Sequence, residues 1–392
     1  MTEITDADLA DLRSRFSRSL AYPDIYLANH SLGRPLDEVE ESMSEFLDHW
    51  YSSLELAWEA WMSKLDEYGQ LISELLEIGR PDAVVLKTSA GQGLRAVLNA
   101  IYVKNGQKPV RVVATESEFD SIHFILKTYS EEGLCEVDWV SPTYAEGEIP
   151  LYETAAMLDS ITSDTDLVVI SQVMFTTGQV LPGMADIVYR AHEAGAYVLA
   201  DYYHAFGVIP APMGDLDFIV GGSYKYVLGG PGACWLAINP RLLDSQELQT
   251  PDTGWFAKED TFSYRRDVGR ASGGQGWWES TPPVAVVYQA LPGLRFLKYV
   301  GVSTLRQFSL NQQSRMRTIF ANEDVPLFEP SNPHGFGAFS LLFSQNAKRV
   351  EVQLKERGVV VDSRGNIVRF GPSLLNTDDE FRKAAQILRD IV

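Results

Sequence analysis

A lysine between two tyrosines is the residue of this sequence with the clearest potential for covalent chemistry. Lys225 follows the apolar run 218–221 and precedes a turn that is rich in glycine, Val-Leu-Gly-Gly-Pro-Gly. A lysine at the end of a buried strand loses hydration, which lowers the pKa of its amine and lets it attack a carbonyl group. Position alone leaves a second interpretation open, in which the strand end releases this lysine into solvent.

An acidic residue ends another apolar run, upstream of this lysine. The segment Val-Leu-Ala-Asp-Tyr-Tyr-His predicts a strand that ends at Asp201, with His204 shortly after it. A buried carboxylate is costly without a partner. A protonated pyridine nitrogen is one such partner, because the pairing increases electron withdrawal by the ring. A structural ion pair with an arginine is the alternative.

A third segment combines hydroxyl groups and glycines between an expected strand and an expected helix. Residues 84–98 read Val-Val-Leu-Lys-Thr-Ser-Ala-Gly-Gln-Gly-Leu-Arg-Ala-Val-Leu. Free N–H groups at a helix N-terminus favour an anion, so a phosphate fits this position. Ser89 is equally compatible with a plain helix N-cap, and the glycine pattern is not a dinucleotide fingerprint.

The remaining polar residues offer weaker candidates. Three histidines on expected helices lack the spacing of metal ligands, so we expect surface or packed positions and no metal site for His49, His123 and His192. A glycine-rich stretch contains three arginines, Arg265, Arg266 and Arg270, which could recognise a carboxylate. An exposed charge cluster is the commoner explanation for such a group. The signature motifs of α/β-hydrolases and P-loop nucleotide hydrolases are absent from the sequence.

The elements that must position these residues alternate between strands and helices. Short β-branched runs at 84–86, 110–114, 167–171, 197–201, 218–221 and 233–238 are separated by segments of helical period. This pattern predicts an α/β fold with a mostly parallel sheet covered by helices on both faces. We expect a helical N-terminal arm over 1–80, a large domain over 81–285 and a smaller C-terminal α+β domain over 286–392. The stretch 264–283 is too polar for a core, and its aromatic content predicts a functional loop.

Composition narrows the class of partner. The chain has 392 residues, with 33 Lys and Arg against 53 Asp and Glu, a formal charge of −20. Such a charge opposes binding to nucleic acid or to an anionic membrane surface. Two distant cysteines build neither a disulfide scaffold nor a zinc module. With no export signal and no run long enough to span a membrane, a cytoplasmic location is expected.

The quoted motifs resemble a known enzyme family. The sequence resembles the fold-type I pyridoxal-phosphate enzymes of class V, and most closely the kynureninases. Three motifs carry this resemblance: the strand followed by Asp-x-x-His, the Ser-Tyr-Lys-Tyr segment with its Gly-Gly-Pro-Gly tail, and Thr177-Gly178-Gln179. The resemblance extends from Tyr26 to Phe370. It implies the fold-type I architecture, a homodimer with the active site at the interface, and pyridoxal 5'-phosphate as cofactor.

The resemblance also implies a role for each matching residue. Lys225 would form the covalent link to the cofactor, Asp201 would pair with its ring nitrogen and Phe119 would stack on the ring. The phosphate would be held by Ser89, Ala90, Tyr224, Trp255 and Thr281, with Ser171 and His204 lining the cofactor. Arg369 would bind the substrate α-carboxylate as a bidentate fork. Further substrate contacts would come from Ser31, His30, Trp58 and Ser280.

Two departures from the kynureninase pattern concern the substrate pocket. The acidic residue that often follows the stacking phenylalanine is displaced or missing in Phe119-Asp-Ser-Ile, and His30 stands where the family has Gly-Asn-Ser. Trp58 is compatible with either an aryl pocket or the core, whereas Trp50 and Trp61 are expected in the core.

The activity implied is hydrolytic Cβ–Cγ cleavage of L-kynurenine or 3-hydroxykynurenine, which gives L-alanine and an anthranilate. Lys225 would act as the base and Tyr224 as a proton relay. The same cofactor also supports transamination and C–S lyase chemistry. A catalytically inactive binding protein is a further alternative.

Overall fold

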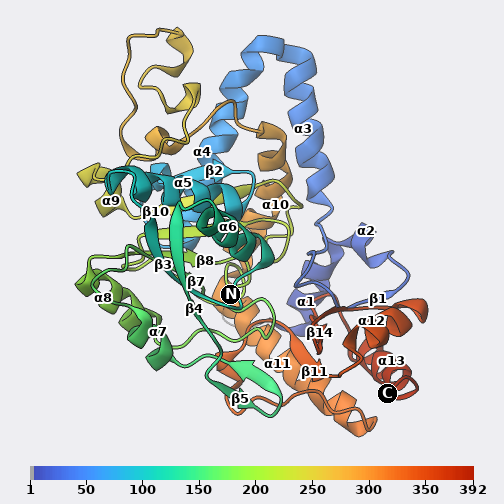
Figure 1. Ribbon diagram of the computed structural model, residues 1–392. Helices are drawn as coiled ribbons and strands as arrows, with labels where there is room; N and C mark the ends of the chain where they lie inside the picture. Colours follow the sequence, from blue (N-terminus) through green and yellow to red (C-terminus); the bar gives the residue numbers. More distant parts are fainter. Residues whose placement is uncertain (1–3) are drawn as a thin grey trace.

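The computed structural model describes residues 4–392 and is built around a seven-stranded sheet (Figure 1). The strand order is β2-β10-β9-β8-β7-β3-β4, and only β10 runs antiparallel to its neighbours. The strands are β2 (Val84–Lys87), β3 (Val110–Thr115), β4 (Cys135–Val140), β7 (Leu167–Ser171), β8 (Tyr197–Asp201), β9 (Phe218–Gly222) and β10 (Cys234–Ile238). The expected α/β fold with a mostly parallel sheet is confirmed.

Side chains alternate between two buried layers along these strands. In β7, Leu167 and Val169 join one hydrophobic cluster, and Val168 and Ile170 join another. The first cluster packs under α5 (Ala90–Lys104) and α6 (Asp120–Glu131), and the second packs under α4 (Ala57–Leu75), α8 (Met184–Ala194) and α10 (Val284–Val300). Helices on both faces explain why the central strands are continuously apolar.

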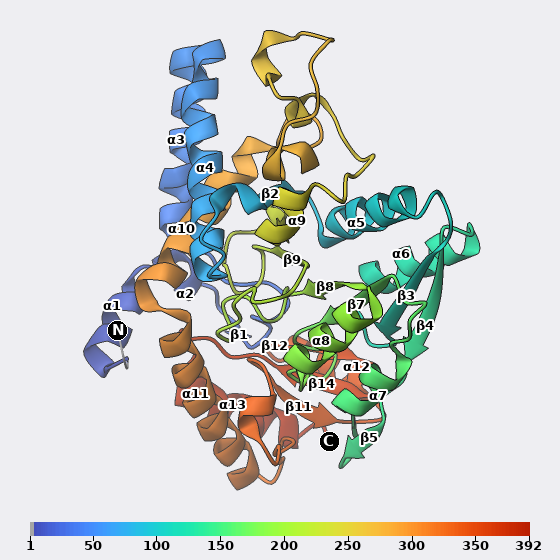
Figure 2. The same cartoon turned by 90° about the vertical axis from the view of Figure 1, so that its left-hand side faces the viewer.

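The N-terminal segment forms a helical hairpin that projects past the sheet, as Figure 2 shows. The segment begins with α1 (Asp6–Ser14), α2 (Ser17–Leu20) and β1 (Ile25–Tyr26). The hairpin itself consists of α3 (Glu38–Ser53) and α4, which a short 3-10 turn joins. Trp61 stacks on Phe46 between the two long helices and is partly buried, as expected. Trp50 is 51% exposed, so its expected core position is wrong. The periodic spacing identified an apolar helix face, but this chain covers that face incompletely.

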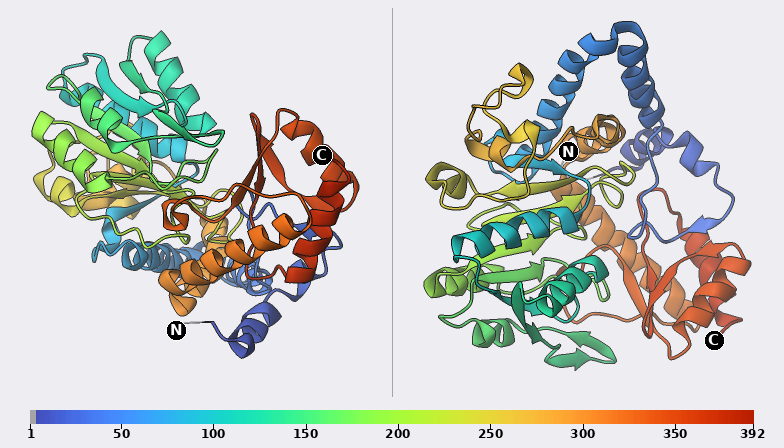
Figure 3. Two further views of the ribbon diagram at one scale, coloured as in Figure 1. Left: turned by 90° about the horizontal axis from the view of Figure 1, so that it is seen from below. Right: turned by 45° about the horizontal axis from the view of Figure 1, so that its top comes forward.

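The C-terminal segment builds a second, smaller sheet (Figure 3). Its order is β11-β14-β13, all antiparallel, and it packs with α11 and α13 around a core that contains Phe320, Phe370 and Phe381. The elements are α11 (Val302–Asn322), β11 (Ser340–Phe343), α12 (Ala347–Glu356), β12 (Val359–Val360), β13 (Asp362–Arg364), β14 (Ile367–Phe370) and α13 (Asp378–Arg389). β12 pairs with β1, which ties the N-terminal segment to this region. The division at 80/81 and 285/286 stays a prediction.

The stretch 264–283 is only partly as expected. It contains one 3-10 turn, Gly273–Trp277, and its first residues are exposed. Trp277 is 5% exposed and packs against Phe218 of β9, so this part of the stretch does contribute to the core. Over residues 4–392, no helix is both long and apolar enough to cross a membrane.

Candidate active site

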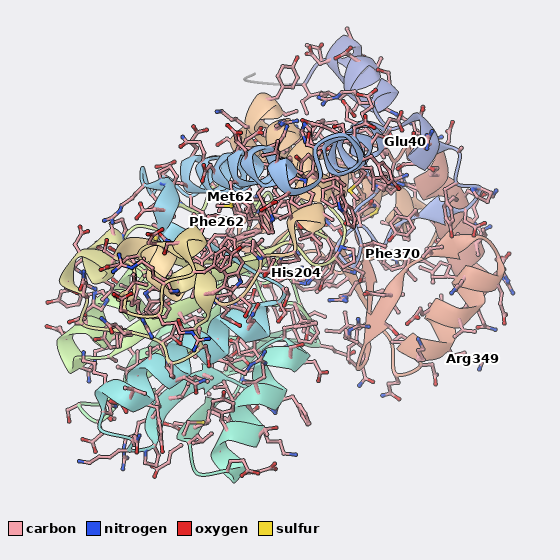
Figure 4. The ribbon with its side chains drawn as sticks, turned by 90° about the horizontal axis from the view of Figure 1, so that it is seen from above. Glu40, Met62, His204, Phe262, Arg349 and Phe370 are labelled. Carbon is pink, nitrogen blue, oxygen red and sulfur yellow. The ribbon has the colours of Figure 1, made fainter. Side chains whose placement is uncertain are left out.

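The predicted chemistry-bearing residues meet at one edge of the large sheet. Parallel strands end on the same side, so the carboxyl ends of β7, β8 and β9 lie together. Ser171 ends β7 directly beside Asp201, which ends β8, and Lys225 follows β9. In Figure 4, His204 lies between the large sheet and the C-terminal strand that carries Phe370. The fold therefore creates a shared site from three separate segments of sequence.

Lys225 is 4% exposed, which rules out the solvent-exposed interpretation. Its Nζ lies 2.8 Å from Nε2 of His204 and within 5.2 Å of the ring centre of Phe119 and 5.5 Å of that of Tyr224. Burial lowers the pKa of the amine to about 7, the charge of Arg369 acts in the same direction, and Asp201 opposes the shift. At neutral pH a large fraction of this amine is therefore unprotonated and nucleophilic.

His204 is a neutral imidazole that orients this amine. Burial, followed by the charges of Lys225 and Arg369, lowers the pKa of His204 well below its ordinary value. A neutral ring carries its proton on one nitrogen, and Nε2 shares the hydrogen bond with the lysine amine, which can donate or accept when it is unprotonated. Among the described residues Nδ1 has no hydrogen-bond partner although it is buried. That nitrogen is available to a bound molecule.

Asp201 is 3% exposed, and no ion pair with an arginine is found for it within residues 4–392. Its Oδ1 accepts a 2.8 Å hydrogen bond from the backbone N–H of Tyr203. Burial raises the pKa of this carboxyl to about 6, while that hydrogen bond and Lys225 lower it. A ring N–H would supply the partner that this carboxylate lacks. This arrangement fits a pyridine nitrogen.

Sequence reasoning missed a second buried carboxylate at this edge. Glu118 is 2% exposed and accepts a hydrogen bond from Thr115 Oγ1 at 2.7 Å. It accepts two more from Ser171, one from Oγ at 2.6 Å and one from the backbone N–H at 3.0 Å. Burial raises the pKa of Glu118 to about 7, and Asp201 adds to the rise. Ser171 is thus oriented by Glu118. The only signal in the sequence is its place immediately before Phe119.

Arg369 belongs to a compact polar network around Asp362. Its Nε and Nη2 donate to the two Asp362 oxygens at 2.7 and 2.5 Å, and its Nη1 donates to the carbonyl of Phe175. His30 Nε2 lies 2.8 Å from Asp362 Oδ1, and Ser31 Oγ donates to Oδ2. The predicted residues His30, Ser31 and Arg369 therefore lie together, on a carboxylate that the sequence did not single out.

The network contains one carboxylate and two guanidinium groups, because Arg364 Nη2 also lies 3.6 Å from Asp362 Oδ2. Although burial alone would raise it, the hydrogen bonds from His30 and Arg369 and the charge of Arg369 hold the pKa of Asp362 well below its usual range. Burial lowers the pKa of His30 to about 4, so His30 is neutral and donates to Asp362. Asp362 thus fixes the direction of the guanidinium and neutralises its charge.

Two phenylalanines connect the arginine network to the lysine. The guanidinium carbon of Arg369 lies 5.3 Å from the ring centre of Phe339, and His204 packs against the same ring at 5.9 Å. Phe175 packs edge-on against Phe119 at 5.4 Å. The lysine and the arginine therefore face a common aromatic region. Neither phenylalanine was predicted from sequence.

The expected anion site lies at the N-terminus of α5, on the same edge of the sheet. β2 runs parallel to β9, because β10 is antiparallel to both. Ser89 is the N-cap of α5, and its side chain accepts from the N–H of Gln92. The hydroxyl therefore serves as a helix cap. Thr88 and Ser89 are exposed and Ala90 is buried, and the phosphate contact at this helix N-terminus stays a prediction.

The other predicted contacts form a separate group. Trp255 Nε1 donates to Thr281 Oγ1 at 3.0 Å, and Ser280 and Thr281 are exposed. Trp58 packs against Phe256 and Phe262 and is partly buried in an aromatic cluster. Within the described chain, no hydrogen bond or ring contact joins these four residues to Lys225 or Arg369. Their predicted contacts with the same substrate and cofactor stay predictions.

Known proteins resemble this chain over nearly its full length. The family model "Aminotransferase class-V" matches residues 25–376. A kynureninase from Bacillus cereus is 26% identical over 402 aligned positions, which cover 98% of this chain and 92% of the relative. A kynureninase from Pseudomonas fluorescens is 26% identical over 400 aligned positions, with the same coverage of each chain. An uncharacterised aminotransferase from Bacillus subtilis is 24% identical and covers 88% of this chain and 90% of its own length.

Solved structures support the fold independently. An apo cysteine desulfurase from Thermococcus onnurineus NA1 superposes with a TM-score of 0.83 over 98% of each chain at 16% identity. A lysine-to-alanine mutant of C-DES, with glycine covalently linked to its pyridoxal-phosphate cofactor, gives a TM-score of 0.83 over 96% of this chain and 99% of that one, also at 16% identity. These likenesses establish the architecture.

The site fits pyridoxal phosphate on its own terms. It offers a largely neutral buried amine, a buried carboxylate without a charged partner, an aromatic ring beside the amine and a helix N-terminus for a phosphate. Since the family model spans most of the sequence, the chain belongs to the class-V aminotransferase family, whose cofactor is pyridoxal phosphate.

Proposed function

We propose that this protein is a pyridoxal-phosphate-dependent hydrolase that cleaves the Cβ–Cγ bond of L-kynurenine or 3-hydroxykynurenine. The observation that carries this proposal is the pairing of a buried amine with a buried guanidinium across Phe339 and Phe175. Such a pair suits an α-amino acid, whose amine reacts near the lysine while its carboxylate binds the arginine. The full-length similarity to kynureninases supports the aryl-ketone substrate.

In this proposal Lys225 both anchors the cofactor and acts as the base. Pyridoxal phosphate, when bound, supplies the electron sink for charge that develops at the substrate α-carbon. The neutral Nζ of Lys225 would take the substrate α-proton, and His204 orients Nζ through the 2.8 Å hydrogen bond. Asp201 accepts a hydrogen bond from the ring N–H and keeps that nitrogen protonated.

Tyr224 is proposed as the proton relay and enters the reaction as a protonated hydroxyl that donates a hydrogen bond. Burial raises the pKa of Tyr224 to about 12, with Asp201 adding to the rise. The hydroxyl therefore keeps its proton at neutral pH. Water supplies the remaining atoms, so one kynurenine and one water give one alanine and one anthranilate.

Arg369 binds the substrate carboxylate while Asp362 keeps its plane fixed. Two donors of Arg369 are taken up by Asp362 and one by a backbone carbonyl. A guanidinium has five N–H groups, so one on Nη1 and one on Nη2 remain for the incoming carboxylate. The charge of Asp362 lowers the net attraction for a carboxylate, which favours substrates that gain further binding energy from an aryl group.

The active form is proposed to be a homodimer in which each chain completes the other's site. Trp255 and Thr281 are predicted to contact the phosphate but make no contact with Lys225 in their own chain, within its described residues. The helical hairpin also exposes large apolar side chains near its tip, namely Trp50, Tyr51, Leu54 and Leu56. A partner chain would bury this surface. Sedimentation at micromolar concentration tests the dimer directly.

A substrate screen tests the activity. The holoenzyme is incubated with L-kynurenine and with 3-hydroxykynurenine, and the fluorescence of the anthranilate product is compared with alanine measured by chromatography. The proposal requires equal amounts of both products, no dependence on a keto acid, and loss of turnover in Lys225→Met. Lys298→Met, which changes an exposed lysine paired with Glu74, is the matched control.

Other outcomes of the screen are equally informative. Turnover of neither substrate refutes the assignment. A requirement for a keto-acid acceptor indicates an aminotransferase, and sulfide release from cysteine or cystine indicates a C–S lyase. Transfer of sulfur to a protein thiol is disfavoured, because Cys135 and Cys234 are both buried and burial raises the pKa of each to about 11.

A further inference from the structure

A cavity that Lys225 does not line lies beside the turn that carries this lysine. It has a volume of about 100 Å³ and is partly open to solvent, between the loop that contains Asn29 and Arg34, the helices α10 and α11, and residues 372–375. Its wall is largely apolar, with side chains that include Phe296, Leu305, Phe308 and Leu374. Tyr226 and Leu228 of the lysine turn complete it, whereas Lys225 does not line it.

One cationic side chain lines this apolar cavity. Arg34 is partly buried and makes no ion pair within residues 4–392. Its Nε donates to Asn29 Oδ1 at 3.3 Å, and its Nη2 donates to Ser373 Oγ at 2.9 Å and Asn376 Oδ1 at 3.0 Å. For Nη1, no partner is found among the described residues.

The electrostatics of Arg34 show that its charge is incompletely compensated. Burial lowers the pKa of Arg34 to about 10, and Glu380 opposes that shift from beyond ion-pair distance. The Glu380 carboxylate is already engaged, since it caps α13 through the N–H of Thr377. A desolvated guanidinium with a free N–H pair favours a carboxylate, which forms charge-assisted hydrogen bonds with it.

We propose that this cavity binds a small monocarboxylic acid with a compact, branched hydrocarbon end. The carboxylate pairs with Nη1 of Arg34, and the hydrocarbon end contacts Phe296, Leu305 and Phe308. Size supports this class for the hydrocarbon end alone, because an apolar cavity of about 150 Å³ accommodates benzene and an isobutyl group has fewer carbon atoms. The present cavity is smaller and suits a short branched chain such as that of isovalerate.

The site is distinct from the catalytic one but touches the same turn. The N–H of Gly33, next to Arg34, donates to the Tyr224 carbonyl at 2.8 Å. The contact is close, since a Cβ on Gly33 would lie 2.0 Å from the Lys225 carbonyl oxygen. The inference does not depend on the substrate proposed above, because it concerns a different cavity and its test measures binding.

Calorimetric titration of the holoenzyme with isovalerate tests the proposal. We expect saturable binding at one site per chain, and binding at least about tenfold weaker for isoamyl alcohol, which has the same hydrocarbon end without the charge. Arg34→Met and the cavity-filling Leu305→Trp should each weaken isovalerate binding by about tenfold or more. Arg315→Met, on the exposed face of α11, should leave it unchanged.

The absorbance of the bound cofactor confirms that each variant is folded. Should Arg34→Met fail to fold, Leu305→Trp and the alcohol comparison still decide the matter. The proposal is overturned if the wild-type holoenzyme shows no saturable binding, if isoamyl alcohol binds as tightly as isovalerate, or if the folded variants bind isovalerate like the wild type.

Discussion

Replacing Lys225 by methionine should stabilise the apoprotein, and the gain should depend on pH. In the folded chain the amine has a pKa of about 7, against an ordinary value of 10.5. Below pH 7 both the folded and the unfolded states carry the charge, so the folded state bears the whole burial penalty. Between pH 7 and 10.5 only the unfolded state still holds the proton, so the stability of the wild type rises with pH.

The size of the effect follows from the shift. A shift of about 3.5 pKa units corresponds to about 5 kcal/mol, of which about 4 kcal/mol remains at pH 7, where the folded amine is half protonated. Methionine has a similar length and no charge, so Lys225→Met should exceed the wild type by about 4 kcal/mol at pH 7 and by little above pH 10.5. Buried functional groups commonly lower stability in this way.

Urea unfolding of the two apoproteins at a series of pH values measures this difference. Titrating groups remote from Lys225 contribute equally to both proteins and cancel, whereas Asp201 and His204 do not, because Lys225 lowers the pKa of each. Lys298→Met serves as the control, since the exposed Lys298 pair with Glu74 should contribute about 1 kcal/mol or less at any pH. A Lys225→Met difference that stays constant between pH 7 and 10.5 would refute the reasoning about the buried amine.

Two further substitutions test the neighbouring charges. Asp201→Asn should stabilise the apoprotein by about 3 kcal/mol above pH 6 and by little near pH 4. The reason is that burial raises the pKa of this carboxyl from 3.8 to about 6, and the burial penalty is present only where the folded carboxyl is ionised. Urea unfolding at both pH values measures the gain, and equal gains would contradict the assignment. Asp362→Asn should destabilise the protein by about 3 to 5 kcal/mol, because it leaves the buried guanidinium of Arg369 without its counter-charge. An unchanged urea midpoint would show that the network is dispensable for stability.

The large sheet was predictable from sequence because most of its strands are buried on both faces. The run 197–200 is continuously apolar and is followed by Asp201, and the structure has β8 at the expected positions 197–201. The edge strand β4 was not predicted. Its sequence, Cys-Glu-Val-Asp-Trp-Val, alternates polar and apolar residues, and Glu136 and Asp138 on one face of this edge strand are exposed.

The site was predictable where a residue lies at the end of such a strand. Asp201 and Lys225 were found in this way. Asp362 and Glu118 were not, because a single acidic residue in a short polar segment looks like a surface residue. Their burial results from the meeting of distant segments, such as 30–31 with 362–369.

Helix period alone could not separate a core face from an exposed one. Trp50 and Trp61 follow the same spacing on the N-terminal hairpin, yet Trp61 stacks on Phe46 while Trp50 is half exposed. The pattern identifies an apolar face but does not say whether the same chain covers it.

Borohydride reduction of the holoenzyme, followed by digestion and mass spectrometry, tests the central claim most directly. The account predicts one modified peptide, with the added mass of the reduced pyridoxal phosphate on Lys225. It is contradicted if the mass is found on another lysine, such as the buried Lys87, or if no lysine is modified.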